Sequence, residues 1–245
     1  MSNNPKKPSN ESVPLYPMRI NKYLALNKYS TRRGGDELVA QGRVFLNGKL
    51  AVLGDKVLET DKVEVRFRPG EKVRDFTYIA YHKPIGKTPT DFLFTKKRGL
   101  AKMSKDIFPI EDLDKDAHGL VLFTNDGRLT TALLAPDSMV PKEYLVKTKG
   151  VPRANFKEKM EAGVQLEDVM TRPARVQMID ENLFRITITD NHKHQIRRMC
   201  VALFAEVTDL KRIAIGTVRL DTLMEGSSRT LAGQELTDFK RALGF

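Results

Sequence analysis

The sequence predicts an α+β protein, because short strands and short amphipathic helices alternate along its 245 residues. The clearest strand is the apolar run at residues 120–123, which the turn residues Asn125-Asp126-Gly127 close. Residues 184–189 alternate between apolar and polar side chains, as in a half-buried strand. Ile196, Cys200 and Leu203 recur at helical spacing. Strands and helices are therefore interspersed along the chain instead of lying in separate regions.

The composition favours a partner with many negative charges. Hydrophobic residues make up 40% of the chain, enough for a real core, and the formal net charge is +11. Such an excess is typical of a protein that binds nucleic acid, although a merely basic protein has the same composition. The first residues, 1–17, are polar and rich in Pro, Ser and Asn, and predict a disordered arm.

Several classes of protein are disfavoured. The single Cys200 rules out an internal disulfide framework and suits a reducing cytoplasm. No cysteine spacing matches a zinc finger, and His192 and His194 are not expected to bind a metal. No apolar run approaches the roughly 18 residues that span a bilayer. We expect a cytoplasmic monomer without metal or membrane contact.

The front of the chain predicts a small basic module. Ile20, Tyr23 and Leu24 repeat at helical spacing, and Ser30 or Thr31 can cap a second helix that runs to about residue 41. Arg32 and Arg33 then lie in its first turn, where cations oppose the helix dipole. A feature that costs helix stability suggests a binding role.

Short strands follow this second helix. Residues 43–47 alternate as a strand, Asn47-Gly48 is a strong hairpin signal, and residues 63–67 alternate again. The mixed charges and the Pro69-Gly70 turn that follow predict a linker at residues 67–75.

This order of elements resembles the S4 RNA-binding domain over residues 18–66. The resemblance rests on residues 19–24, 30–33 and 42–48, which agree in order and spacing. Gly34-Gly35 departs from it, because each glycine costs a helix roughly 1 kcal/mol relative to alanine. The resemblance implies that a set of basic residues contacts RNA phosphates: Arg19, Lys22, Arg32, Arg33 and Arg43.

Residues 76–245 then form a larger domain. We expect strands at residues 78–81 and 142–147, the first ended by His82-Lys83-Pro84. We expect helices at residues 128–134 and 152–160. Pro152 begins the second helix and Gly163 stops it. Residues 87–104 form a basic loop that is either solvated or bound to RNA.

An acidic cluster at residues 111–116 directly precedes the apolar strand. A carboxylate at the edge of a core strand can be aimed rigidly into a cleft, although such clusters are usually solvated loops. Asp112 and Asp116 are competing carboxylates, and in an extended segment Asp112 shares the side of Asp114. Arg197 lies beside the apolar stripe of Ile196, Cys200 and Leu203 on the predicted helix. A guanidinium fixed in such a place needs an anionic partner.

The larger domain resembles the pseudouridine synthases. Three motifs carry the resemblance: Leu113, Asp114, Ala117, Gly119 and Leu120; Lys142 and Tyr144; and residues 194–199. With the S4 resemblance it spans about residues 18–237. It is strongest to the subgroup that modifies large-subunit ribosomal RNA and, in some members, a tRNA anticodon loop. It implies a mixed, mainly antiparallel central sheet flanked by helices.

The resemblance also implies a reaction that needs no cofactor and no metal. A uridine is isomerised to pseudouridine, with Asp114 as the catalytic carboxylate, Arg197 as its ion-pair partner and Tyr144 stacked on the uracil. Asp114 attacks ribose C1′ or removes a proton at C2′; both routes stay open. Lys83, Lys142 and Arg198 are implied to contact RNA. The target base must leave its stack, which favours single-stranded or irregular RNA.

Two positions depart from the subgroup. Glu111-Asp112 stands where its members read Gly-Arg, and His82 stands where they usually have Asn. Two added acids near the site could repel RNA. The alternative function is therefore a non-catalytic RNA-binding or ribosome-assembly protein on the same scaffold.

Overall fold

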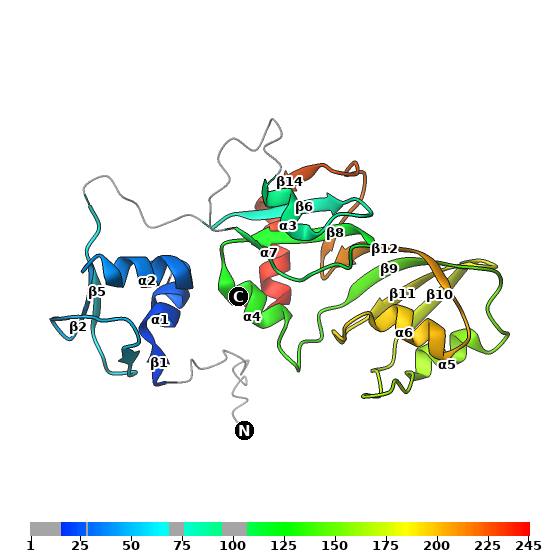
Figure 1. Ribbon diagram of the computed structural model, residues 1–245, viewed down its shortest axis with the longest axis horizontal. Coiled ribbons are helices and arrows are strands. Elements are labelled where there is room, and N and C mark those ends of the chain that lie inside the picture. Colours follow the sequence, from blue (N-terminus) through cyan, green and yellow to red (C-terminus); the bar gives the residue numbers. More distant parts are fainter. Residues whose placement is uncertain (1–15, 28, 69–75, 95–106) are drawn as a thin grey trace, which may run out of the picture. The chain divides into compact units, whose positions relative to one another are not determined.

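The computed structural model describes residues 16–27, 29–68, 76–94 and 107–245. The chain divides into two compact units, residues 1–75 with the last two residues, and residues 76–243 (Figure 1). Three expected segments fall wholly or largely outside the described residues: the N-terminal arm, most of the linker and most of the basic loop. Within the described ranges no helix is both long enough and apolar enough to cross a membrane.

The first unit is a pair of helices against small strands. Its elements are β1 (Met18–Arg19), α1 (Ile20–Leu26), α2 (Arg32–Ala40), β2 (Val44–Leu46), β3 (Lys49–Leu50), β4 (Lys56–Val57) and β5 (Val63–Val65). Thr31 caps α2 by accepting a hydrogen bond from Gly34 N at 3.0 Å, as the sequence predicts. Asn47 and Gly48 both have positive φ and join β2 to β3 in the predicted hairpin.

The two glycines of α2 have a packing role. Both are buried, and a Cβ on Gly35 would lie 3.3 Å from the Cα of Asn21 in α1. A Cβ on Gly34 would meet the Ser30 hydroxyl. The two glycines lower the intrinsic helix propensity of α2, and their missing side chains allow α1 to pack closely against it.

The second unit is built on a large sheet. Its strands are β6 (Tyr78–Lys83), β7 (Phe108–Pro109), β8 (His118–Thr124), β9 (Lys142–Thr148), β10 (Arg175–Asp180), β11 (Leu183–Ile188), β12 (Val207–Ile215), β13 (Val218–Arg219) and β14 (Ser228–Thr230). Its helices are α3 (Pro89–Phe94), α4 (Gly127–Leu133), α5 (Phe156–Ala162), α6 (Gln195–Ala202) and α7 (Gly233–Ala242).

The sheet is mixed and mainly antiparallel, as expected. Its order is β10-β11-β9-β12-β8-β6-β14, with β13 paired to β12 and β7 to β8. Only β12 and β8 run parallel, and they share just two residue pairs. The segment that leads into β8 therefore lies close to β12 and β9 at the middle of the sheet.

Helices cover both faces of this sheet (Figure 1). Val121 and Phe123 of β8 pack in one core with residues of α5 and α6, and Leu120 and Leu122 pack in a second core with residues of α4 and α7. Because alternate side chains of a strand point to opposite faces, a continuous apolar run marks a strand that is buried on both sides. The prediction of a buried strand at residues 120–123 is confirmed.

Two predicted boundaries were wrong. Helix α5 begins at Phe156 instead of Pro152, since Asn155 provides its N-cap position and the residues before it form a turn. Strand β6 continues through His82 and Lys83, where we expected it to end. Both extra residues pair with β8, so tertiary pairing overrides the local turn signal of Pro84.

Candidate active site

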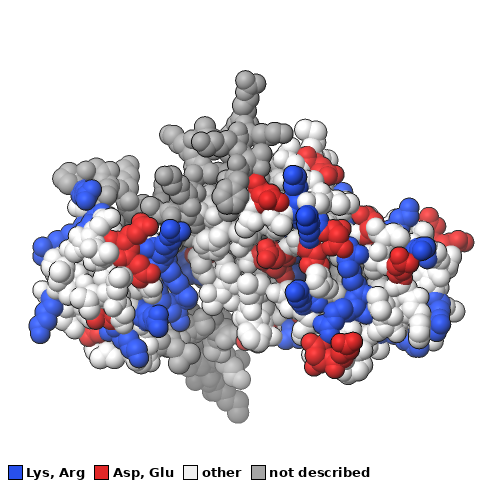
Figure 2. Space-filling view, viewed as in Figure 1, with Lys and Arg blue, Asp and Glu red and all other residues white. Residues whose placement is uncertain are grey.

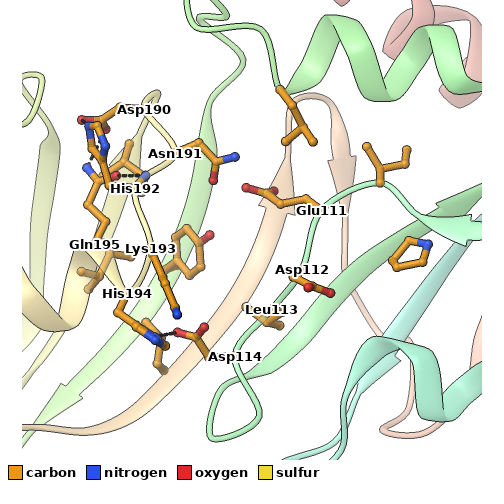
Figure 3. Close-up of a pocket in the computed structure, with 17 residues that line it drawn as sticks. Glu111, Asp112, Leu113, Asp114, Asp190, Asn191, His192, Lys193, His194 and Gln195 are labelled. Carbon is orange, nitrogen blue, oxygen red and sulfur yellow. Dashed lines mark hydrogen bonds and ion pairs between the residues drawn. The ribbon is translucent and has the colours of Figure 1, made fainter.

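A cleft of about 510 Å³ lies where the segment before β8 faces β9 and the loop before α6 (Figure 3). One wall consists of residues 109–114, and the other of residues 188–196. Tyr144 of β9 and Leu210 of β12 also line it. The cleft thus joins segments that are separated by about 80 residues in sequence, through the central strands of the sheet.

Asp114 is the acidic residue held at the centre of this cleft. Its side chain is about one quarter exposed, and its Oδ2 lies 2.7 Å from Nδ1 of His194. An ionised carboxylate only accepts hydrogen bonds, so His194 Nδ1–H donates to it. Figure 3 shows the Lys193 side chain pointing toward the same carboxyl group. Asp114 therefore has a hydrogen-bond donor on the opposite wall of the cleft.

A buried network fixes the loop that carries His194. Gln195 Nε2 donates to Asp190 Oδ1 at 2.6 Å, and Gln195 Oε1 accepts from the backbone N–H of His192 at 3.1 Å. Asp190 also accepts from the backbone N–H of Arg172 at 2.9 Å. His194 itself has a left-handed backbone, with φ of 51°. The turn aims the imidazole back across the cleft at Asp114.

Tyr144 supplies an aromatic ring to the cleft. It is buried, and it lies between Ile186 of β11 and Arg212 of β12 in the register of the sheet. Burial raises the pKa of its phenol, and the neighbouring Arg212 guanidinium opposes that shift only in part. The hydroxyl is therefore neutral near pH 7 and can both donate and accept a hydrogen bond.

Arg197 does not pair with Asp114, and this prediction was wrong. Within the described residues its Nη2 forms an ion pair with Asp116 Oδ2 at 2.9 Å, and its Nη1 donates to Val207 O at 3.3 Å. Arg197 directly follows Ile196, a buried residue of the apolar stripe of α6, as expected. It holds the loop that carries Asp114 instead of contacting Asp114.

Glu111 is buried in an ionic cluster. It accepts a hydrogen bond from Arg212 Nη1 at 2.9 Å, and its other oxygen lies 3.4 Å from Lys142 Nζ. All three side chains are less than one tenth exposed. Glu111 therefore lies between two buried cations, although it also lines the cleft. Lys142 is buried as well, and its RNA contact stays a prediction.

Lys83 is likewise buried. Its Nζ donates to the carbonyl oxygens of Lys87 at 2.7 Å and Pro84 at 3.1 Å, so it closes the turn after β6. Burial lowers the pKa of this amine to about 8, although Asp116 and Asp114 nearby favour its charged form. The RNA contact of Lys83 likewise stays a prediction.

The remaining predicted site residues lie at the surface. Asp112 and Asp114 both line the cleft and Asp116 does not, because residues 115–116 form a turn that ends the extended segment. Arg198 is partly exposed and pairs with Asp168 outside the cleft. In the first unit Arg32 and Arg33 are exposed, whereas Arg43 donates to Arg66 O at 2.9 Å. Arg19 is exposed and Lys22 is half-buried.

Charge alone does not mark one binding face. Figure 2 shows Lys and Arg on both units, intermixed with Asp and Glu, without a single uniformly positive surface on the face in view. The arrangement of particular groups, rather than net charge, has to identify the site.

Sequence reasoning placed Glu111 near the site and His194 in a motif, but it missed the contact of His194 with Asp114 and the burial of Glu111 with Arg212. His194 stood in the motif at residues 194–199, but periodicity does not reveal that it reaches across the cleft. The apolar residues 213–215 that follow Arg212, and its place in a central strand, could have indicated a buried cation that needs a buried acid.

Comparison with known protein families gives two matches. Residues 77–202 match the family described as RNA pseudouridylate synthase, and residues 18–63 match the S4 domain. Together these matches cover the two compact units in the order that the sequence predicts.

Individual relatives agree. The chain is 38% identical to the dual-specificity RNA pseudouridine synthase RluF of Salmonella typhi over 90% of this chain and 78% of the relative. It is 32% identical to the ribosomal large subunit pseudouridine synthase B of Bacillus subtilis over 89% of this chain and 93% of the relative. A crystal structure of a pseudouridylate synthase superimposes with a TM-score of 0.65 at 27% identity, covering 92% of this chain and 99% of that one.

Proposed function

This chain belongs to the RNA pseudouridine synthases that carry an N-terminal S4 domain, and we propose that it isomerises a uridine of large-subunit ribosomal RNA with Asp114 as the catalytic carboxylate. The observation that carries the residue assignment is the cleft itself, in which the carboxyl group of Asp114 and the ring of Tyr144 share one lining. The substrate assignment draws on two relatives, one a ribosomal large subunit pseudouridine synthase and one a dual-specificity RNA pseudouridine synthase. A tRNA is the second candidate substrate.

The reaction needs few groups. The bond between ribose C1′ and uracil N1 breaks, the base rotates, and C5 bonds to C1′; the C5 proton is lost and N1 gains one. Product and substrate are isomers, so no group is transferred to or from a third molecule. A single carboxylate at the sugar–base junction is enough to start this sequence.

The surrounding groups have distinct parts in this proposal. His194 orients Asp114 through its 2.7 Å hydrogen bond and balances its charge when protonated. The Tyr144 ring offers a face on which the extruded uracil stacks, and its neutral hydroxyl lies near the base for proton transfer. Lys193, which is exposed at the cleft wall, is placed to contact a phosphate next to the target nucleotide.

The substrate must present its base outside a helix. Flipping a stacked base costs a few kcal/mol, and loops or bulges lower this cost. The S4 unit supplies affinity through phosphate contacts, which carry little sequence information. Ribosomal RNA is cytoplasmic in bacteria, and we place the reaction there.

The test is a carbodiimide-based map of pseudouridine in total RNA from cells with the wild-type protein, with Asp114→Asn and with Asp112→Asn. Asp112 is the matched control, because it lines the same cleft without bonding to His194. We expect one mapped site to disappear with Asp114→Asn and to persist with Asp112→Asn. Its position identifies the target RNA. An unchanged map together with altered ribosome assembly would favour the non-catalytic alternative.

A second measurement separates the two chemical routes. RNA that carries deuterium at C2′ of the target uridine slows the reaction if Asp114 removes that proton, since the C–H bond breaks in the step. If Asp114 attacks C1′ instead, the rate with deuterated RNA equals the rate with ordinary RNA. Single-turnover kinetics with saturating enzyme provide the comparison.

A further inference from the structure

A pair of histidines outside the cleft has an unusual arrangement. His82 lies near the end of β6 and His118 at the start of β8, and these antiparallel neighbours place the two rings on the same face. The ring centroids are 6.2 Å apart, with 19° between the planes. His82 is buried and His118 is half-buried. Neither ring contributes to the proposed reaction.

Each ring has one nitrogen fixed by a hydrogen-bond acceptor. His82 Nδ1 lies 2.8 Å from Leu223 O, and a carbonyl can only accept, so Nδ1 carries the hydrogen. His118 Nε2 lies 3.1 Å and 3.3 Å from the two oxygens of Asp209, so it also donates. In the neutral rings the lone pairs are therefore on His82 Nε2 and His118 Nδ1.

These two remaining nitrogens are buried and have no hydrogen-bond partner among the described residues. Two buried lone pairs that share a small space without a donor are costly, unless an electrophile lies between them. A metal ion bound by imidazole meets this requirement.

A third ligand is present at the same place. A carboxylate oxygen of Glu225 and ligand nitrogens of both histidines all lie within 4.8 Å of one another. Glu225 is held near β6, because Gly226 N donates to His82 O at 2.8 Å and His82 N donates to Ser227 O at 3.0 Å. Glu225 and Asp209 together offer two negative charges, against the one positive charge of nearby Lys211.

We propose that His82, His118 and Glu225 form a binding site for a divalent transition-metal ion of the zinc type, with one coordination position left open. Two imidazoles and a carboxylate are a donor set that zinc accepts. Leu223 O and the Asp209 carboxylate are the outer partners that orient the two rings, as outer acceptors do in established metal sites. The sequence alone led us to expect no metal, because the three ligands are far apart in the chain.

The site ties together three parts of the second unit. It joins the end of β6, the start of β8 and the loop at residues 223–227. His118 follows Asp114 by four residues, and Ala117 N donates to Asp114 O at 3.0 Å in the turn between them. The metal is structural in this proposal: it fixes the strand from which the catalytic loop extends, and it does not touch the substrate.

The experiment is a zinc titration of the full-length protein without an affinity tag, after chelator treatment, with a chromophoric zinc chelator as competitor. We expect one zinc ion per chain and a higher melting temperature with zinc than without it. Asp209→Asn should weaken binding by roughly 10–100-fold, since it removes only an orienting partner. Glu225→Gln should weaken it at least as much, and it should fold normally because Glu225 is exposed.

The matched control is Glu206→Gln, an equally exposed acid on the same unit that pairs with Lys149. It should bind zinc as the wild type does. The cobalt form should lack the near-ultraviolet band of a thiolate ligand, because Cys200 lies outside the site. Absence of stoichiometric binding by the wild type would overturn the proposal. Equal affinity in Glu225→Gln, Asp209→Asn and the wild type would overturn it as well, because the zinc would then lie elsewhere.

Discussion

At the scale of single residues, the cleft is defined by hydrogen bonds between segments that are remote in sequence. Asp114 precedes a strand and His194 precedes a helix, and each of them is partly exposed. Their 2.7 Å contact exists because the network of Asp190 and Gln195 fixes the second loop. The nucleophile in our proposal is thus positioned by a residue that no local pattern singles out.

We predict that His194→Asn lowers the rate of pseudouridine formation at saturating RNA by roughly 10–100-fold. A hydrogen bond to a charged group contributes about 1.5–3 kcal/mol. Without this bond Asp114 is less well oriented, and the activation free energy rises by about that amount. RNA affinity should stay the same. His192→Asn is the control, because His192 lies in the same loop without a bond to Asp114. If both variants lose the same activity, His194 has no special role.

A second residue-scale prediction concerns the buried ionic cluster. Glu111→Gln leaves Arg212 and Lys142 buried without their acid, and breaking a buried pair in this way costs about 3–5 kcal/mol. Urea denaturation should show the free energy of unfolding reduced by this amount. Glu206→Gln removes an exposed pair with Lys149 and should change it by less than about 1 kcal/mol. A small effect for Glu111→Gln would mean that water reaches the cluster.

At the scale of elements, the start of β8 depends on a glycine. Gly119 has φ of 108°, and a Cβ there would lie 2.2 Å from the carbonyl oxygen of Arg212 in β12. Only a residue without a side chain allows β12 to pair so closely at this point. This approach brings Arg212 within reach of Glu111 and sets the direction of the loop that carries Asp114.

We predict that Gly119→Ala destabilises the second unit by at least about 1–3 kcal/mol, the cost of a strained backbone, with the steric clash in addition. Thermal unfolding followed by circular dichroism measures it. Gly127→Ala is the matched control: Gly127 opens α4 with nothing within 4 Å of its Cβ position. There alanine should be neutral or stabilising by up to about 1 kcal/mol. Equal effects at both positions would contradict the packing argument.

At the scale of the whole molecule, binding and chemistry belong to different units. The S4 unit carries exposed cations at the start of α2, and the second unit carries the cleft. Because phosphate contacts position RNA without reading its sequence, changes in the S4 unit should alter affinity and leave the chemical step alone.

We therefore predict that Arg32→Ala combined with Arg33→Ala weakens RNA binding and makes the slope of log affinity against log salt less negative by about 1.4–1.8, the value for two lost phosphate contacts. The rate at saturating RNA should be unchanged. Lys157→Ala combined with Lys159→Ala removes the same charge from the exposed face of α5 and serves as control. Equal slopes in the two double variants would indicate general charge attraction and no specific S4 contact.

The sequence by itself determined the elements and the two principal cleft residues. Period-two alternation, the unbroken apolar run of β8 and the Asn47-Gly48 turn are local signals, and each has its physical cause in neighbouring residues. The motif match placed Asp114 and Tyr144 together, and both line the cleft.

Only the tertiary structure decided which charges meet. It paired Asp114 with His194 instead of Arg197, buried Glu111 with Arg212, and withdrew Lys83 and Lys142 from solvent. These pairings depend on the strand order of the sheet and on the left-handed backbone of His194. A charged side chain pairs with the group that the folded backbone brings near it. Local periodicity says which face a side chain occupies, and it carries no information about what lies opposite.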